Sequence, residues 1–336
     1  MAPPLVDTLG RPIRDLRVSV TDRCNFRCVY CMPKEVYGPG HAFLERAELL
    51  SFEEITRLAR VFAGLGVKKF RLTGGEPLVR RDLPALVAML AAIGGLDVTL
   101  TTNGSLLDRH AGALRAAGLS RLTVSLDSLD DEVFRRMNDV GAPVATVLEG
   151  IAAAERAGFT RLKINMVVKR GVNDASIVPM ARRFRGTGHV VRFIEYMDVG
   201  TTNGWRLDDV VPASDIVAAI HREFPLEPTG RAITSDTAES FRYRDGAGEI
   251  GVVASVTRAF CRDCVRARLS ANGSLYTCLF ATKGHDLKAL VRSDAPDEAL
   301  AAEITRVWSA RGDRYSELRS AATAGLPRVE MSYIGG

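Results

Sequence analysis

The sequence has no long apolar run, few aromatic residues and no low-complexity tract. A transmembrane helix needs about 20 mostly apolar residues, so we expect no membrane partner. Aromatic residues make up 7% of the chain and do not alternate with basic ones, as a surface that stacks RNA bases requires. We therefore expect no nucleic-acid partner, although the net charge of +5 is compatible with an anionic ligand.

The first ten residues lack the basic flank and apolar core of a signal peptide. We therefore expect a cytoplasmic protein, in which reducing conditions make structural disulfides rare. The 336 residues can form one large or two modest domains. Hydrophobic content of 46% and charged content of 25% are typical of a globular enzyme. The six cysteines must then serve a purpose other than cross-linking.

The cysteines form two groups of three, and neither group has a fourth member nearby. The first group has the spacing C-x3-C-x2-C and the second C-x2-C-x13-C; they are Cys24, Cys28 and Cys31, and Cys261, Cys264 and Cys278. A cubane iron–sulfur cluster takes four ligands. Three cysteines would leave one iron open to bind something else, as catalytic metal sites leave one position open.

Structural zinc is the alternative for each group, since Cys3His sites are common. In the first group, His41 follows Cys31 by ten residues across a stretch rich in proline and glycine. In the second, His285 follows Cys278 by seven residues, which keeps zinc open there. The occurrence of two incomplete tetrads in one chain favours two clusters, each with an open iron.

Strand-like and helix-like segments alternate along most of the chain. The predicted strands are residues 17–21, 69–73, 97–101, 121–126, 161–168 and 190–196. The predicted helices are residues 52–65, 82–92, 108–117, 130–137, 144–157, 174–184 and 214–224. Ser51 and Glu54 have the spacing of a capping box at the first helix. This alternation predicts right-handed βαβ crossovers and a parallel sheet, hence an α/β fold.

The run from Thr21 to Cys31 resembles the cysteine loop of the radical S-adenosylmethionine (SAM) superfamily. The resemblance implies a partial (β/α)6 TIM-like barrel with chemistry at the carboxyl ends of the strands, and six predicted units match it. In that superfamily the open iron binds SAM, and one electron cleaves SAM to a 5′-deoxyadenosyl radical. The residues that the resemblance assigns to SAM are Tyr30, Gly75, Glu76, Ser125 and Met197.

From about residue 9 to its end the chain resembles the GTP 3′,8-cyclase family of molybdenum cofactor biosynthesis. The motifs that carry this resemblance are residues 16–25, 69–77, 101–104, 124–130, 163–165 and 192–197, the second cysteine group, and the Gly-Gly ending. It implies a lyase that converts GTP to (8S)-3′,8-cyclo-7,8-dihydroguanosine 5′-triphosphate. The adenosyl radical removes the ribose 3′ hydrogen, and C3′ then attacks guanine C8. The second [4Fe–4S] cluster binds the guanine ring.

Basic residues lie beside the predicted strand ends and the second cysteine group. Arginine donates bidentate hydrogen bonds to phosphate oxygens, although each of these residues alone could be a solvated surface charge. Lys163 alternates with Ile164 and Met166, so it is predicted to point into the barrel. The residues assigned to GTP are Arg17, Arg71, Thr102, Lys163, Arg266, Ala267 and Arg268, with Lys69 and Arg192 as further candidates.

The Gly335–Gly336 ending is implied by the family resemblance to enter the active site, where side chains would not fit. The alternative is a frayed terminus.

We expect a barrel domain over residues 1–230 and a C-terminal iron–sulfur extension over residues 231–336 that caps the open side. The implied partners are a flavodoxin- or ferredoxin-type electron donor and cyclic pyranopterin monophosphate synthase, which receives the product; a homodimer is a further option.

Two other functions stay open at this point. One is a different radical SAM enzyme with an auxiliary cluster, such as a peptide maturase. Those extensions usually carry more than three cysteines, and Arg266 and Arg268 would then lack an anion. The other is an RNA-binding protein stabilised by zinc or a cluster, which the aromatic content disfavours.

Overall fold

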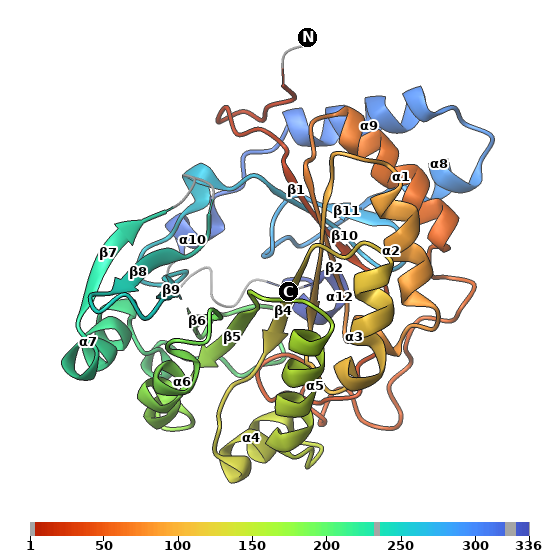
Figure 1. Ribbon diagram of the computed structural model, residues 1–336. Coiled ribbons are helices and arrows are strands. Elements are labelled where there is room, and N and C mark those ends of the chain that lie inside the picture. Colours follow the sequence, from red (N-terminus) through yellow and green to blue (C-terminus); the bar gives the residue numbers. More distant parts are fainter. Residues whose placement is uncertain (1–3, 232–235, 320–326, 336) are drawn as a thin grey trace.

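The computed structural model describes residues 4–231, 236–319 and 327–335, and its strands form one twelve-stranded sheet. Six parallel strands in chain order form the centre of this sheet (Figure 1). They are β1 (Asp15–Ser19), β2 (Lys69–Thr73), β3 (Asp97–Thr102), β4 (Arg121–Ser125), β5 (Lys163–Val168) and β6 (Val190–Glu195). The predicted partial (β/α)6 barrel is confirmed.

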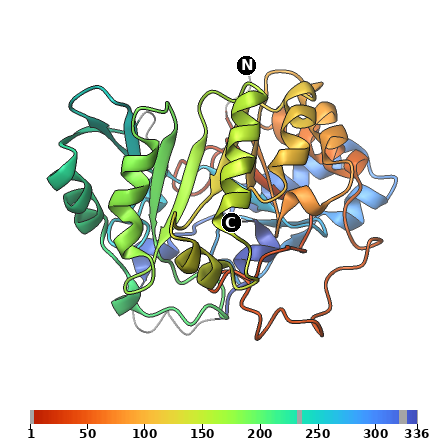
Figure 2. The same cartoon turned by 60° about the horizontal axis from the view of Figure 1, so that its bottom comes forward.

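Helices connect these strands and cover the outer face of the sheet (Figure 2). They are α1 (Phe52–Gly64), α2 (Leu83–Ala91), α3 (Leu107–Ala116), α4 (Asp131–Asn138), α5 (Val144–Arg156) and α6 (Ile177–Phe184). The predicted capping box of α1 is present: Glu54 N donates to Ser51 Oγ and Ser51 N donates to Glu54 Oε2, at 3.1 and 2.6 Å. It stabilises the start of the helix that packs behind β1 and β2.

Many predicted boundaries differ from the observed ones by one to three residues, and two elements show why. The first strand begins at Asp15 rather than Arg17 and ends at Ser19 rather than Thr21, because the Thr21 carbonyl accepts from Gly75 N instead of continuing the ladder. The helix predicted over residues 174–184 begins only at Ile177, after a 3-10 turn at Asp174–Ser176. Asn173 donates from Nδ2 to the carbonyls of Asp127 and Val167, which holds this turn against β4 and β5.

The part of the chain that follows β6 adds strands to both edges of the barrel sheet. After α7 (Ala213–Glu223), β7 (Leu226–Gly230), β8 (Glu239–Tyr243) and β9 (Glu249–Val253) follow β6, with β9 parallel to it. At the other edge, β10 (Arg266–Leu269) lies parallel to β1, followed by β11 (Ser274–Tyr276) and β12 (His285–Asp286). Both open edges of the barrel are thus paired, as exposed sheet edges require. The division into domains at residue 230 stays a prediction.

The remaining helices lie at the C-terminal part of the chain. They are α8 (Lys288–Arg292), α9 (Asp297–Ser309), α10 (Tyr315–Leu318) and α12 (Met331–Ile334). Helices α8 and α9 pack beside α1, whereas α12 lies within the curve of the sheet (Figure 1). Among the described helices, none is long and apolar enough to cross a membrane.

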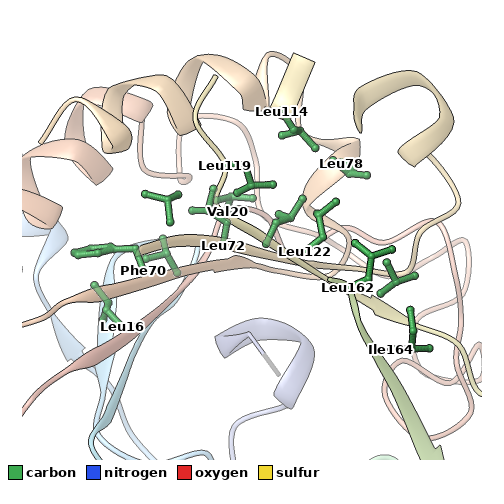
Figure 3. Close-up of a cluster of buried hydrophobic side chains, with 14 of the residues drawn as sticks. Leu16, Val20, Phe70, Leu72, Leu78, Leu114, Leu119, Leu122, Leu162 and Ile164 are labelled. Carbon is green, nitrogen blue, oxygen red and sulfur yellow. The ribbon is translucent and has the colours of Figure 1, made fainter. Parts of the chain in front are cut away.

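The hydrophobic core lies between the sheet and its outer helices (Figure 3). Leu16, Phe70, Leu72 and Ile164 point to this side and are fully buried. Because side chains alternate along a strand, their neighbours in sequence point to the inner face. That face carries the basic side chains of the same strands, which line a cavity.

Candidate active site

A cavity of about 1000 Å³ fills the inner side of the curved sheet, and both cysteine groups line it. Among its lining residues are almost all of the predicted site residues: the six cysteines, Tyr30, Gly75, Glu76, Ser125, Met197, Thr102, Arg17, Lys69, Arg71, Lys163, Arg192, Arg266 and Arg268. Ala267 and Gly335 are not among the lining residues; Ala267 alternates with the two arginines, and its side chain lies in the core. One enclosed space therefore borders both predicted cluster sites.

The first cysteine loop follows β1, and Arg27 holds its shape. The Arg27 guanidinium donates from Nη1 to the carbonyls of Cys24 and Phe26, each at 2.8 Å, and from Nε to the Tyr37 carbonyl at 2.7 Å. Cys31 N donates to the Cys28 carbonyl at 2.9 Å. Burial raises the pKa of the Cys24 thiol to about 12, and the carboxylate of Glu76 adds to this shift.

The loop after β2 lies directly against the start of the cysteine loop. Gly75 N donates to the Thr21 carbonyl at 2.8 Å, and Glu76 N donates to the Arg23 carbonyl at 2.9 Å. A Cβ at Gly74 or Gly75 would overlap these same backbone atoms. Glycine is therefore required here for contact between two loops of the chain, in addition to any approach to a ligand.

Glu76 is fully buried, and its carboxylate accepts three hydrogen bonds. Oε1 accepts from Thr102 Oγ1 at 2.7 Å and from Leu78 N at 3.0 Å, and Oε2 accepts from Asn103 N at 2.7 Å. Burial raises its pKa to about 7, against the effect of these donors. Thr102, predicted to bind GTP, thus donates to the carboxylate predicted to bind the SAM ammonium, and its part in GTP binding stays a prediction.

Tyr30 contacts Asp127, a carboxylate that was not predicted to belong to the site. Its hydroxyl donates to Asp127 Oδ2 at 2.8 Å, while Val167 N donates to Asp127 Oδ1 at 2.9 Å. Burial raises the pKa of Asp127 to about 6. Asp127 lies two residues after Ser125, so its place at the end of β4 was visible in the sequence, but its partner Tyr30 was not.

The second cysteine group has basic surroundings. Burial by itself would raise the pKa of the Cys264 thiol, but Arg266 and Arg311 outweigh that effect and lower it to about 6. Cys278 differs, because burial and Asp313 raise its pKa to about 12. A thiol with a lowered pKa is a ready thiolate ligand.

Seven of the basic side chains that line the cavity belong to the predicted site, and we call them the basic cluster. They are Arg17, Lys69, Arg71, Lys163, Arg192, Arg266 and Arg268. Burial and, after it, the neighbouring cations lower the pKa of Lys163 to about 7. Arg192 shifts to about 9 and Arg268 to about 10 for the same reasons. Arg17 Nε is buried without a hydrogen-bond partner. Buried charges of one sign require an opposite charge, which an anionic ligand would supply.

Asp15 is a member of this site that the sequence reasoning missed. Its Oδ2 accepts from Lys69 Nζ at 2.7 Å, and its Oδ1 is buried without a partner. Burial raises the pKa of Asp15, but Lys69, Arg17 and Arg71 reverse the shift and hold the pKa below its usual value. Asp15 and Arg17 share one face of β1, since they are two residues apart, and that spacing was the available signal.

The C-terminal segment enters the cavity. Arg268 Nη1 donates to the Gly335 carbonyl, and a Cβ on Gly335, whose φ is +74°, would overlap Thr73 Oγ1. Glu330 holds the segment farther back: its carboxylate accepts from Thr201 N, Thr201 Oγ1 and Thr202 Oγ1 at 2.8 to 2.9 Å. Gly336 lies outside the described residues.

The two cysteine groups fit cluster ligation by chemistry and placement. Within the described ranges, no group of three or more His, Cys, Asp or Glu side chains is arranged to hold a single metal ion. In a four-iron cluster each thiolate binds a different iron, so its ligands need not converge on one point. All six free cysteines are partly buried and border one cavity.

Comparison with known proteins agrees with this geometry. The sequence model of the radical SAM superfamily matches residues 18–184, and that named Molybdenum Cofactor Synthesis C matches residues 189–317. The chain is 55% identical to the GTP 3′,8-cyclase of Acidothermus cellulolyticus and 53% identical to that of Xanthomonas axonopodis pv. citri, in each case over 100% of both chains. It is 47% identical to the GTP 3′,8-cyclase of Staphylococcus aureus, again over 100% of both chains.

Among solved structures, Streptococcus suis SuiB bound to precursor peptide SuiA has a TM-score of 0.60 at 13% identity, covering 86% of this chain and 67% of that one. At that identity the likeness shows the fold alone. Together, the barrel, the cysteine loop and the superfamily match define a radical SAM protein, which implies SAM and a [4Fe–4S] cluster. Within that superfamily, the chain belongs to the GTP 3′,8-cyclase family of molybdenum cofactor biosynthesis. The predicted family is confirmed.

Proposed function

We propose that the protein is a GTP 3′,8-cyclase, a lyase that uses SAM to convert GTP into 3′,8-cyclo-7,8-dihydro-GTP in molybdenum cofactor biosynthesis. The observation that carries the proposal is the single cavity. At one end it presents three cysteines beside Glu76, and at the other three cysteines beside the basic cluster. A cationic and an anionic substrate could therefore bind side by side, as a radical transfer between them requires.

Each half of the cavity supplies groups for one substrate. Glu76 accepts from the SAM ammonium, with Tyr30, Gly75, Ser125 and Met197 around the remainder of that molecule. The clusters, when bound, supply the electron for SAM cleavage and an iron that orients the guanine. Zinc at the second group remains the alternative that an experiment must exclude.

For GTP, the basic cluster neutralises the triphosphate. Lys163 and Arg192 on β5 and β6 approach it from one side, Arg266 and Arg268 on β10 from the other. The carbonyl of Gly335 already accepts from Arg268, so the tail and the nucleotide meet at the same guanidinium. We assign the tail a part in guiding the nucleotide radical rather than in binding substrate.

The wider context belongs to the same proposal. A flavodoxin- or ferredoxin-type protein would donate electrons, and cyclic pyranopterin monophosphate synthase would receive the product, in the cytoplasm. A homodimer is compatible with these assignments.

The test is anaerobic reconstitution of the full chain, followed by iron analysis and incubation with GTP and SAM. We expect about eight iron per chain, for two [4Fe–4S] clusters, and equal amounts of 5′-deoxyadenosine and cyclised nucleotide. About four iron with one retained zinc would return the second cysteine group to a structural role. Absence of cyclised nucleotide from the fully loaded chain would contradict the proposed function.

A further inference from the structure

The segment before β1 is bound to the second cysteine group by one carboxylate and two arginines. Asp7 Oδ2 accepts from Arg11 Nε at 2.6 Å and from Arg311 Nη1 at 3.1 Å, and Oδ1 accepts from Leu9 N and Arg11 N, each at 2.9 Å. Asp7 and Arg311 are 304 residues apart in sequence. We call Asp7, Arg11 and Arg311 the Asp7 clamp.

Both arginines also donate to the backbone of the cysteines themselves. Arg11 Nη1 donates to the Cys261 carbonyl at 2.7 Å and to the Asp313 carbonyl at 2.8 Å. Arg311 Nη1 donates to the Cys264 carbonyl at 2.7 Å. The two carbonyls bracket the 3-10 turn Cys261–Asp263, so the clamp determines how far apart and in which direction the first two thiols of this group lie.

The clamp is a buried structure. The side chains of Asp7, Arg11 and Arg311 are at most 2% exposed. The Arg311 guanidinium lies 4.5 Å from the ring of Trp308, whose Nε1 donates to the Arg11 carbonyl at 3.1 Å. Two guanidinium groups face two carboxylates here, because Arg311 also forms an ion pair with Asp313.

Such a buried ionic group is weak evidence for stability, since desolvation offsets much of the attraction. Its place against two thiol-bearing residues indicates a different purpose. Arg11 Nη2 and Arg311 Nε are buried without a hydrogen-bond partner, although Arg311 Nε is 3.4 Å from Asp313 Oδ2. The Arg311 guanidinium nevertheless lies against the Cys264 backbone, next to thiols that become anionic ligands.

We infer that Asp7, Arg11 and Arg311 are positioning residues for the second cluster. They hold the Cys261–Cys264 turn in its ligating shape, and the Arg311 guanidinium beside Cys264 favours the reduced cluster. This inference rests on the proposed function, because it assumes a cluster at the second cysteine group. Hydrogen bonds and net charge around the ligands are the means by which a protein tunes a cluster. Residues 7 and 11 precede the superfamily match, so the site depends on a segment outside the barrel.

The first measurement is the rate at which a ferrous chelator removes iron from the anaerobically loaded chain. Arg11→Lys and Arg311→Lys keep the charge but lose the guanidinium geometry, and each should speed the loss of about four of eight iron at least threefold. Arg57→Lys is the matched control. Arg57 also bonds one carboxylate, Asp297, and two carbonyls, those of Val291 and Ala295, none of which belongs to a cysteine. It should leave the rate unchanged.

The second measurement is the reduction potential of the second cluster, followed by electron paramagnetic resonance in a chain whose Cys24, Cys28 and Cys31 are alanine. Arg311→Met should shift the potential negative, whereas Arg57→Met should not. Circular dichroism checks that each variant is folded. If Arg311→Met does not fold, Arg11→Met replaces it, since it removes the guanidinium that bonds the Cys261 carbonyl and should shift the potential in the same direction.

Equal iron loss in the clamp and control variants, or an unaltered potential in the folded clamp variant, would overturn the inference. Neither measurement needs turnover. A chain that holds two clusters with these properties but makes no cyclised nucleotide would therefore contradict the proposed function and leave the clamp intact. A chain that holds zinc in place of the second cluster and still makes cyclised nucleotide would overturn the clamp inference alone.

Discussion

The two cysteine groups border one cavity but have opposite electrostatic surroundings. Carboxylates lie near the first group. Burial raises the pKa of Cys24, and Glu76 adds to this shift. Burial also raises the pKa of Cys31, with contributions from Glu330 and Asp127. Near the second group lie guanidinium groups, and Arg266 and Arg311 bring the pKa of Cys264 down to about 6. The same kind of ligand is thus held in an acidic environment in one place and a basic one in the other.

This difference matches the charges of the two substrates that we propose. SAM carries an ammonium and a sulfonium against one carboxylate, so it is a net cation, whereas GTP carries a triphosphate. Complementary charge both attracts a substrate and rejects the wrong one. The cavity therefore distinguishes two nucleoside substrates of similar size chiefly by charge, and the predictions below test that division from the largest expected effect to the smallest.

The first prediction separates the two groups by function. Cys24→Ala should abolish SAM cleavage, because the first cluster then lacks a ligand. Cys261→Ala should still form 5′-deoxyadenosine while losing cyclised nucleotide, because only the GTP half is altered. Both products are measured by chromatography after anaerobic incubation. Equal loss of SAM cleavage in the two variants would show that the groups are not independent.

The second prediction concerns the tail, which passes from the acidic half to the basic half. Deletion of Gly335 and Gly336 should leave both clusters, SAM binding and GTP affinity nearly intact. Cyclised nucleotide should fall at least about tenfold, or 1.4 kcal/mol of barrier stabilisation, because Gly335 bonds Arg268 and lies against Thr73. Deletion of Met1 and Ala2 at the other terminus is the control. Full product yield from the truncated chain would make the tail an ordinary terminus.

Much of the fold and of the site could be predicted from the sequence, because the patterns that define these elements are local. The strand at Lys69–Thr73 agrees with prediction at both ends, since alternation and flanking turn residues define it. Lys163 alternates with Ile164 and Met166, and it lines the cavity while they are buried in the core. Period-two patterns require only neighbouring residues.

The parts that escaped prediction depend on contacts between distant segments. Nothing near Asp7 indicates that its partner is Arg311, and nothing near Thr102 indicates that its hydroxyl meets Glu76. The placement of β9 and β10 at opposite edges of the sheet likewise follows from which edges were free. Such pairings are set by the folded topology and leave no periodic trace in the chain.

The third prediction uses the pH dependence of GTP binding. In the free protein the pKa of Lys163 is about 7, and a bound triphosphate raises it. The affinity for GTP should therefore be highest below about pH 7, where Lys163 of the free protein is already protonated, and should fall as the pH rises above 7. Between pH 7.5 and 8.5 we expect a decrease of about threefold to tenfold, measured by anaerobic titration calorimetry. In Lys163→Met this decrease should be much smaller.

Lys283→Met is the control, because Lys283 is exposed and is not a lining residue of the cavity. Stability gives an independent check with the opposite sign. Since the pKa of Lys163 is lower in the folded chain than its usual 10.5, the unfolded chain binds more protons between about pH 7 and 10.5. The free energy of unfolding of the ligand-free protein should therefore rise with pH in that window, and less so in Lys163→Met. If GTP affinity falls with pH equally in Lys163→Met and in the unaltered chain, the assignment of Lys163 to the triphosphate is contradicted.

The smallest expected effect comes from Glu330, which holds the tail on the acidic side while Arg268 holds it on the basic side. Three donors from Thr201 and Thr202 converge on its carboxylate. Glu330→Gln keeps one acceptor oxygen and loses the other, at a cost of about 1 kcal/mol. The tail then spends less time in the cavity, so the ratio of cyclised nucleotide to 5′-deoxyadenosine should fall about twofold to threefold with SAM cleavage unchanged. Glu303→Gln, whose carboxylate bonds only a neighbouring arginine of α9 among the described residues, should leave the ratio as it is. A ratio equally unaffected in Glu330→Gln would mean that Arg268 alone retains the tail, and that the acidic half has no part in guiding the nucleotide.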